Sequence, residues 1–203
     1  MSQSIKGGLI AGFNLTQIDG DQLYGYHKIG LNLGATAIVP VGKKFSATIE
    51  TIYTQKGSYQ SPKDTLSSPP YKLILNYLEA PVFFSYTDKD VIKAGAGFSW
   101  GRLVQFQEWE HLKRVNWTTS YGPYNPNDYD VLIDLQFKIH NGFWLDCRYF
   151  YSITKIRTRT FTDVSGNVWT RKQYNNDIAL RLIYVFKEKP SPKKSDKDAK
   201  KIK

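Results

Sequence analysis

Apolar and polar residues alternate along several segments of the chain, and this period of two limits the possible folds more than any other feature. From residue 28 to residue 39 every odd position is apolar, while the even positions include Lys28, Asn32 and Thr36. A side-chain period of two belongs to a β-strand, because successive residues of a strand point to opposite faces. Aromatic residues make up 15% of the chain, and they favour pleated surfaces. The sequence therefore predicts an all-β protein.

The alternation recurs in eight segments, and the connections between them are long and tight in turn. The predicted strands cover residues 5–15, 28–39, 45–56, 75–86, 91–107, 129–139, 143 to about 161, and 178–186. The first, third, fifth and seventh connections are long, whereas the others are tight turns, one of which carries Asn141 and Gly142. Transmembrane barrels of outer membranes have this asymmetry between short periplasmic turns and longer outer loops. We therefore expect an eight-stranded antiparallel transmembrane β-barrel over residues 4–187, with both termini in the periplasm.

The two ends of the chain lie outside this pattern. No apolar stretch reaches the roughly 18 residues of a transmembrane helix, and Met1 to Ser4 show no signal peptide. An exported chain is therefore expected to have lost its signal peptide already. Residues 188–203 are rich in lysine, which predicts a disordered periplasmic tail. Four of its lysines are candidate contacts to an acidic periplasmic partner or to anionic lipid heads: Lys193, Lys194, Lys200 and Lys201. A solubilising overhang without a partner is the alternative.

The alternation does not say which face of the barrel is inside. A soluble, lipocalin-like barrel turns its apolar face inward around a ligand, whereas a membrane barrel turns it outward. The polar faces carry charges of both signs among many glycines, which suits a narrow lumen in which the charges pair across strands. Tyr and Trp residues near the strand ends fit a membrane interface. The predicted lumen charge network consists of Lys28, Glu50, Lys56, Glu79, Asp134, Asp146, Arg148 and Arg181.

Two outer segments are candidate binding surfaces. The connection from residue 108 to residue 128 contains the aromatic residues Trp109, Trp117, Tyr121 and Tyr124. Such rings stack on sugars or pack on a partner, and the alternative is that they fold the loop onto itself as a lid. On the last predicted hairpin, Arg157, Arg159, Arg171 and Lys172 form a basic group that can meet the phosphates of lipopolysaccharide. A solvated basic face is the alternative there.

The sequence offers no pattern for catalysis or for a cofactor. His27, His111 and His140 are far apart and stand in no metal-ligand spacing. A nucleophile motif and a phosphate-binding loop are both missing from the sequence. The positive charge is dispersed without a nucleic-acid-binding module, so we expect no nucleic-acid partner. We therefore expect a protein that is not an enzyme and that binds no metal or cofactor, although an active site assembled in space, for example from Asp146 and a His, stays open.

Three short motifs carry a family resemblance. They are Lys6-Gly7-Gly8-Leu9 with Phe13-Asn14-Leu15, then Tyr53-Thr54-Gln55-Lys56-Gly57, then Asn76-Tyr77-Leu78-Glu79-Ala80-Pro81. Their order and spacing resemble the porin-family, PorT-like outer-membrane β-barrel proteins of Bacteroidota. The resemblance implies a place in the cell outer membrane, and it identifies Glu50 and Glu79 as inward-facing lumen residues. The lysine-rich extension after the last strand departs from barrels that end on an aromatic residue.

These observations leave three functional hypotheses. The first is a structural or accessory subunit of a larger outer-membrane assembly, such as machinery for protein secretion, insertion or uptake. Its partners would be outer-membrane lipid, lipopolysaccharide and other outer-membrane or periplasmic proteins. The second is a small porin-like channel for ions or small solutes. The third is a soluble barrel with an apolar ligand, which predicts a protein that stays in solution without detergent.

Overall fold

The fold consists of β-strands joined by turns and loops. The structure, a computed structural model, describes residues 5–21, 23–61, 70–110, 112–115, 124–162 and 165–186. No helix in these ranges is long and apolar enough to cross a membrane. The strands are β1 (Lys6–Asp19), β2 (Lys28–Val41), β3 (Phe45–Gln60), β4 (Tyr71–Asp88), β5 (Ile92–Glu110), β6 (Lys113–Val115), β7 (Asn127–His140), β8 (Phe143–Ser152), β9 (Arg157–Thr162) and β10 (Val168–Val185).

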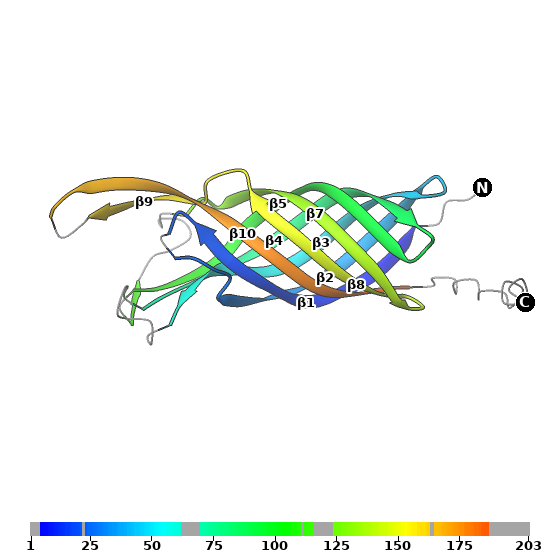
Figure 1. Cartoon of the computed structure of the whole chain (residues 1–203), viewed down its shortest axis with the longest axis horizontal. Helices are drawn as coiled ribbons and strands as arrows, with labels where there is room; N and C mark the ends of the chain where they lie inside the picture. Colours follow the sequence, from blue (N-terminus) through cyan, green and yellow to red (C-terminus); the bar gives the residue numbers. More distant parts are fainter. Residues whose placement is uncertain are drawn as a thin grey trace, which may run out of the picture.

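Eight of these strands close into a barrel. Neighbours pair antiparallel in the order β1-β2-β3-β4-β5-β7-β8-β10, and β10 returns to pair with β1. The closing ladder runs from Gly8↔Val185 to Asp19↔Tyr174. Figure 1 shows the strands tilted around a common axis, as closure of a sheet requires. The predicted all-β, antiparallel barrel is confirmed.

The two ends of the barrel differ. At one end the strands are joined by tight turns, and β1 begins and β10 ends there; we call this the turn end. Positive φ angles at Lys89, Asp90 and Gly142 allow two of these turns to reverse the chain within a few residues. The opposite end, called the loop end, carries the longer connections. The predicted alternation of tight and long connections is therefore present in the structure.

Two short strands, β6 and β9, add to the eight predicted ones. β6 pairs with the outer end of β5, where Trp109 faces Arg114. The seventh predicted strand was expected to run unbroken to about residue 161, but β8 ends at Ser152 and β9 begins at Arg157. The β7–β8 ladder ends at Asp130↔Ser152, and one further hydrogen bond of 2.8 Å, from the Ile153 nitrogen to the Tyr129 carbonyl, follows it. Beyond that level the chain follows β10 alone, and Figure 1 shows the resulting hairpin extending past the barrel.

Apolar side chains lie on the outer face of the strands and polar side chains on the inner face, as in a membrane barrel. Ile29, Phe98 and Ile133 are 70%, 66% and 65% exposed on the outer face. Between such residues the polar positions point inward, and Glu50 is only 2% exposed. Small residues allow the strands to approach: a Cβ on Gly30 would lie 1.9 Å from the carbonyl oxygen of Gln55. The inside of this barrel is therefore its polar side.

Apolar side chains fill the lumen between the polar groups. One cluster consists of Ile10, Ile52, Phe83, Leu132, Trp144, Phe150, Ala179, Ile183 and Val185. A second cluster, which reaches the loop end, consists of Ile18, Leu73, Leu75, Tyr77, Leu103, Phe106, Tyr124 and Ile156. These clusters contribute the non-directional, hydrophobic part of the packing inside the barrel. The buried charges of the lumen lie among them.

Candidate functional site

The first candidate site is a group of five charged side chains inside the barrel, which we call the arginine cluster. It consists of Glu50, Asp134, Asp146, Arg148 and Arg181, all at most 2% exposed. Arg148 binds Glu50 through two hydrogen bonds of 2.8 and 3.0 Å and donates from Nε to Asp134 at 2.7 Å. The flat guanidinium group suits such forked binding of carboxylates. Arg148 also lies 4.4 Å from the centre of the Phe83 ring.

Arg181 extends this cluster to the last strand of the barrel. Its Nη1 donates to Glu50 at 3.0 Å, and its Nε donates to Asp146 at 2.7 Å. Glu50 of β3 therefore accepts from both guanidinium groups, one on β8 and one on β10. The arginine cluster ties strands on opposite sides of the lumen together. Its three carboxylates and two guanidinium groups sum to a formal charge of −1.

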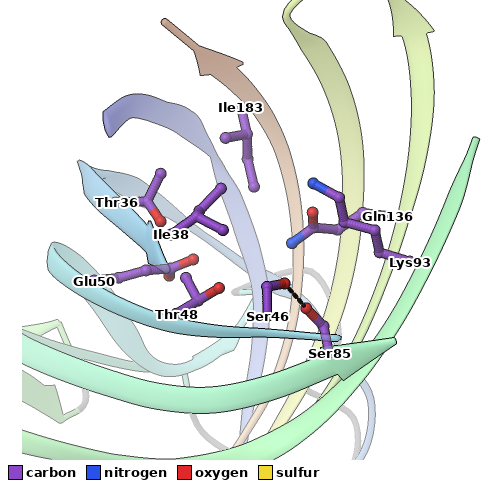
Figure 2. A pocket seen from close by; sticks show the side chains of 9 residues that line it. All are labelled: Thr36, Ile38, Ser46, Thr48, Glu50, Ser85, Lys93, Gln136 and Ile183. Atoms are coloured by element: carbon purple, nitrogen blue, oxygen red, sulfur yellow. Dashed lines mark hydrogen bonds between the residues drawn. The ribbon is translucent and has the colours of Figure 1, made fainter. Parts of the chain in front are cut away.

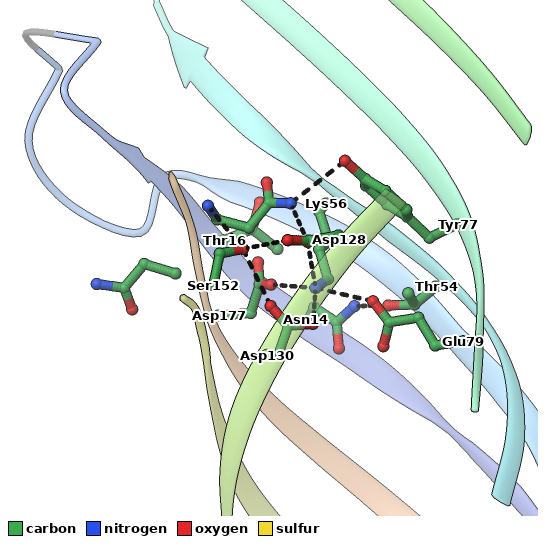
Figure 3. A network of polar contacts seen from close by, with 12 residues as sticks. Asn14, Thr16, Thr54, Lys56, Tyr77, Glu79, Asp128, Asp130, Ser152 and Asp177 are labelled. Atoms are coloured by element: carbon green, nitrogen blue, oxygen red, sulfur yellow. Dashed lines mark hydrogen bonds and ion pairs between the residues drawn. The ribbon is translucent and has the colours of Figure 1, made fainter. Parts of the chain in front are cut away.

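The second group lies nearer the loop end, and we call it the lysine cluster. It consists of Lys56, Glu79, Asp128, Asp130 and Asp177, all at most 2% exposed. Figure 3 shows the Lys56 ammonium group among the four carboxylates. The distances from Lys56 Nζ are 2.8 Å to Glu79 and Asp130, and 3.4 Å to Asp128 and Asp177. One ammonium and four carboxylates sum to a formal charge of −3.

Neutral side chains support only part of the lysine cluster. Ser152 donates to Asp128 at 2.7 Å, and Asn175 donates to the same carboxylate at 2.6 Å. Among the described residues, neither oxygen of Asp177 accepts a hydrogen bond, so this carboxylate depends on its ion pair with Lys56. An ammonium is a compact point charge, and here it occupies the point on which the carboxylates converge. The described residues contain no group of three or more His, Cys, Asp or Glu that could hold a metal ion.

A third polar group links the protruding hairpin to the loop end of the barrel. Arg157 of β9 donates two hydrogen bonds of 3.0 Å to Glu108 of β5. Tyr71 and Tyr124 donate to the same carboxylate at 2.7 and 3.0 Å. Further out, Arg159 of β9 pairs with Glu110 of β5. The base of the hairpin is therefore attached across the mouth of the barrel.

At the turn end, a small recess leads toward the arginine cluster. Nine side chains line this recess (Figure 2): Thr36, Ile38, Ser46, Thr48, Glu50, Ser85, Lys93, Gln136 and Ile183. Ser46 and Ser85 face each other at 2.9 Å across its wall. The recess has a volume of about 10 Å³, which is about the space of one water molecule. It is too small for an organic ligand.

Asp21, whose carboxyl group lies outside the spanning strands, has a shifted pKa. Asp21 lies in the loop after β1 and is 8% exposed. Burial raises the pKa of its carboxyl group to about 6, although hydrogen bonds from Ser58 and from the backbone of Leu23 oppose the shift. The Leu23 nitrogen donates to Asp21 Oδ1 at 2.8 Å. This loop carboxyl can change its charge in mildly acidic solution.

The structure brings most of the predicted lumen residues into these two clusters. Seven of the eight belong to the arginine and lysine clusters; the exception is Lys28, which is buried but donates to the backbone carbonyl of Ile29 at 3.4 Å. The sequence does not single out Asp128 or Glu108, because both lie in the predicted connection from residue 108 to residue 128. Asp130 and Asp177 stand at polar positions of the alternation, but the alternation does not identify their common partner, Lys56.

The predicted surface residues are distributed differently. Trp109 is half-buried on β5 with the Lys72 ammonium 5.2 Å from its ring centre. Tyr124 is buried against Phe106 and Glu108 and is not part of the surface. Arg157, of the basic group on the hairpin, is likewise buried in its pair with Glu108. Two loop residues, Trp117 and Tyr121, and the tail residues Lys193, Lys194, Lys200 and Lys201 lie outside the described residues.

Comparison with known proteins agrees with this architecture. The crystal structure of Ail, the attachment invasion locus protein of Yersinia pestis, has a TM-score of 0.51 at 12% identity, covering 92% of this chain and 100% of Ail. Neisserial surface protein A has a TM-score of 0.50 at 11% identity, covering 91% of this chain and 99% of that protein. These likenesses concern the fold alone, and no curated protein matches the sequence. A family model described as "Outer membrane protein beta-barrel domain" matches residues 1–157, and the chain therefore belongs to this family of outer-membrane β-barrel proteins.

Proposed function

We propose that this outer-membrane barrel is a non-enzymatic structural or accessory subunit of a larger outer-membrane assembly. The observation that carries the proposal is the pair of buried charged clusters in the lumen, whose ion pairs connect different strands. Arg148 and Arg181 each bind carboxylates from other strands at 2.7 to 3.0 Å. The interior of an eight-stranded barrel is just wide enough for side chains to fill. A filled lumen suits a protein that acts through its surfaces.

The outer surface supports a position within the lipid layer. Exposed apolar residues cover the outer face, and aromatic residues such as Tyr86 and Tyr129 lie toward the ends of the strands. Rings with a polar group favour the interface between lipid and water. We propose that this face contacts lipid and that the turn end faces the periplasm, as in barrels with short periplasmic turns. Lipopolysaccharide would then surround the loop end.

The surfaces available to partners lie at the two ends. At the loop end, the β9–β10 hairpin extends past the barrel (Figure 1). At the turn end β10 ends at Val185, and the sequence continues with the lysine-rich residues 188–203. The kind of assembly we propose, machinery for secretion, insertion or uptake, rests on the resemblance to PorT-like barrels of Bacteroidota. That finer relationship is itself part of the proposal.

The test is extraction of membranes of the native organism with a mild detergent, with a tag on this chain. We expect companion proteins in fixed ratio to the tagged chain. A matched variant that ends at residue 187 tests the tail separately, because loss of one companion from this variant assigns that contact to residues 188–203. A barrel that is recovered alone in both forms contradicts the proposal.

A second measurement separates the proposal from the channel hypothesis. The purified barrel in a planar bilayer is expected to show no steady conductance, because buried side chains fill the lumen at both clusters. Regular conductance steps, which change size when Lys56 or Arg148 is replaced, would establish a channel and contradict a purely structural role.

A further inference from the structure

The protruding hairpin exposes a strand edge that is not used within the barrel. β1 pairs with β10 as far as Asp19↔Tyr174, and β9 pairs with the outer part of β10 from Gln173 to Val168. On the side of β10 away from β9, no described strand pairs with Val168 to Arg171. Figure 1 shows this part of the hairpin standing clear of the barrel. We call the backbone edge of Val168 and Thr170, on the side of β10 away from β9, the free edge.

The direction of the backbone groups at this edge follows from the last contact with β1. A Cβ on Gly20 would lie 2.3 Å from the carbonyl oxygen of Lys172, so this carbonyl points toward the chain that leaves β1. Residues two apart on a strand direct their backbone groups to the same side. Thr170 and Val168 therefore present their N–H and C=O groups to the free edge. Gly20, with a φ of 90°, ends β1 and turns the chain away from them.

The charge of the hairpin limits what can pair with this edge. Its described residues include four basic and no acidic side chains. Arg157 and Arg159 are paired with Glu108 and Glu110 of β5, whereas Arg171 and Lys172 are exposed on β10. Basic residues on an edge strand discourage pairing with a second copy of the same strand, because like charges would face each other. A strand with acidic side chains meets no such repulsion.

The position of the edge favours a protein partner over lipid phosphate. Val168 lies ten positions before Ile178 of the apolar outer face, which is roughly 33 Å along a strand at about 3.3 Å per residue. A two-stranded ribbon of this kind is also only marginally stable by itself. A third strand would satisfy its unpaired backbone groups and stabilise it. Addition of a strand to an exposed sheet edge is an established mode of peptide recognition.

We propose that the free edge binds an extended acidic segment of a partner protein as an added β-strand. This inference rests on the proposed function, since it assigns a docking surface to the assembly subunit. Backbone hydrogen bonds to Thr170 and Val168 supply the pairing, and Arg171 with Lys172 selects acidic side chains. The lumen clusters and the apolar outer face take no part in the contact.

The test uses the full chain in detergent micelles and a fluorescent nine-residue peptide that alternates glutamate and valine. We expect saturable binding, measured by fluorescence anisotropy. The same peptide methylated on alternate backbone nitrogens is expected to bind at least about tenfold more weakly, because it cannot add as a strand. The double variant Arg171→Glu with Lys172→Glu is expected to lose the acidic peptide and to bind the matching lysine-valine peptide.

One further pair of variants isolates the backbone contribution. Thr170→Pro removes a backbone N–H at the free edge and is expected to weaken binding about tenfold, whereas Thr170→Ala keeps that N–H and is expected to bind as the unchanged protein does. If the methylated peptide and Thr170→Pro bind normally while charge reversal abolishes binding, the surface recognises anions such as lipopolysaccharide phosphate and the proposal is wrong. Failure of the acidic peptide to bind the unchanged protein also overturns it. Either failure leaves the companions found by membrane extraction unaffected, so the two proposals are tested independently.

Discussion

The arginine and lysine clusters both neutralise buried carboxylates, but they use different cations in different numbers. Both bury carboxylates inside the barrel, but the arginine cluster has two forked cations for three carboxylates, whereas the lysine cluster has one ammonium for four. Buried charges are costly to desolvate, and removal of one partner leaves the rest uncompensated. We therefore expect that loss of a single cation lowers the free energy of unfolding more in the lysine cluster than in the arginine cluster.

The largest effect is expected for Lys56→Met, because it leaves four buried carboxylates without their common cation. The free energy of unfolding should fall by more than the about 3–5 kcal/mol typical of breaking a buried pair. Urea unfolding in micelles, followed by tryptophan fluorescence, measures the change. Lys28→Met is the matched control, since Lys28 is also buried but donates to a backbone carbonyl. Equal losses for the two variants would contradict the central role of Lys56.

A smaller loss is expected for Arg148→Met, because Arg181 still contacts Glu50 and Asp146. We expect a decrease of about 3–5 kcal/mol in the same unfolding experiment. Arg148→Lys keeps the charge and loses the fork, so its loss should be intermediate between the unchanged protein and Arg148→Met. A larger loss for Arg148→Met than for Lys56→Met would reverse the proposed ranking of the clusters.

The pH dependence of the free energy of unfolding distinguishes the loop carboxyl group of Asp21 from the charged groups of the lumen. The pKa of Asp21 rises from 3.8 to about 6 on folding, so the folded state holds this proton more tightly than the unfolded chain does. The contribution of Asp21 is therefore fully present below pH 3.8 and is lost as the pH rises to about 6. Allowing for partial exposure, we expect a decrease on the order of 1–2 kcal/mol over this range. Asp21→Asn should remove this part of the slope, and any slope that remains in the variant belongs to other groups, including the lumen clusters.

The smallest effect is expected for Asp177→Asn. This carboxylate accepts no hydrogen bond from the described residues and belongs to the cluster with excess negative charge. Its neutralisation should leave the free energy of unfolding within about 1 kcal/mol of the original, in the stabilising direction. Asp146→Asn, in contrast, should destabilise because it breaks the pair with Arg181. Similar losses for both variants would show that the excess charge of the lysine cluster is compensated in another way.

The sequence predicts the strands of this barrel better than it predicts the contacts inside. Period-two alternation places Arg148 and Glu50 on inward faces, but it does not say that they meet across 98 positions of sequence. That meeting depends on the tilt and stagger of the closed sheet, which no local pattern encodes. The register shift at Asn76 and Tyr77 adds a further irregularity. Strand ends are the weakest point, because Glu108 and Asp128 continue the inward faces beyond the predicted strands.

The closure of β10 onto β1 has a consequence for the order of folding. One residue of each charged cluster lies on β10: Asp177 belongs to the lysine cluster and Arg181 to the arginine cluster. Until the final strand has docked, Glu50 lacks one of its two guanidinium partners and the sheet has two open edges. Contacts between the two ends of a chain carry a high loop-closure cost and form slowly. An unclosed chain therefore presents mismatched charges and unpaired edges together, so a truncated product should be poorly tolerated in a lipid environment.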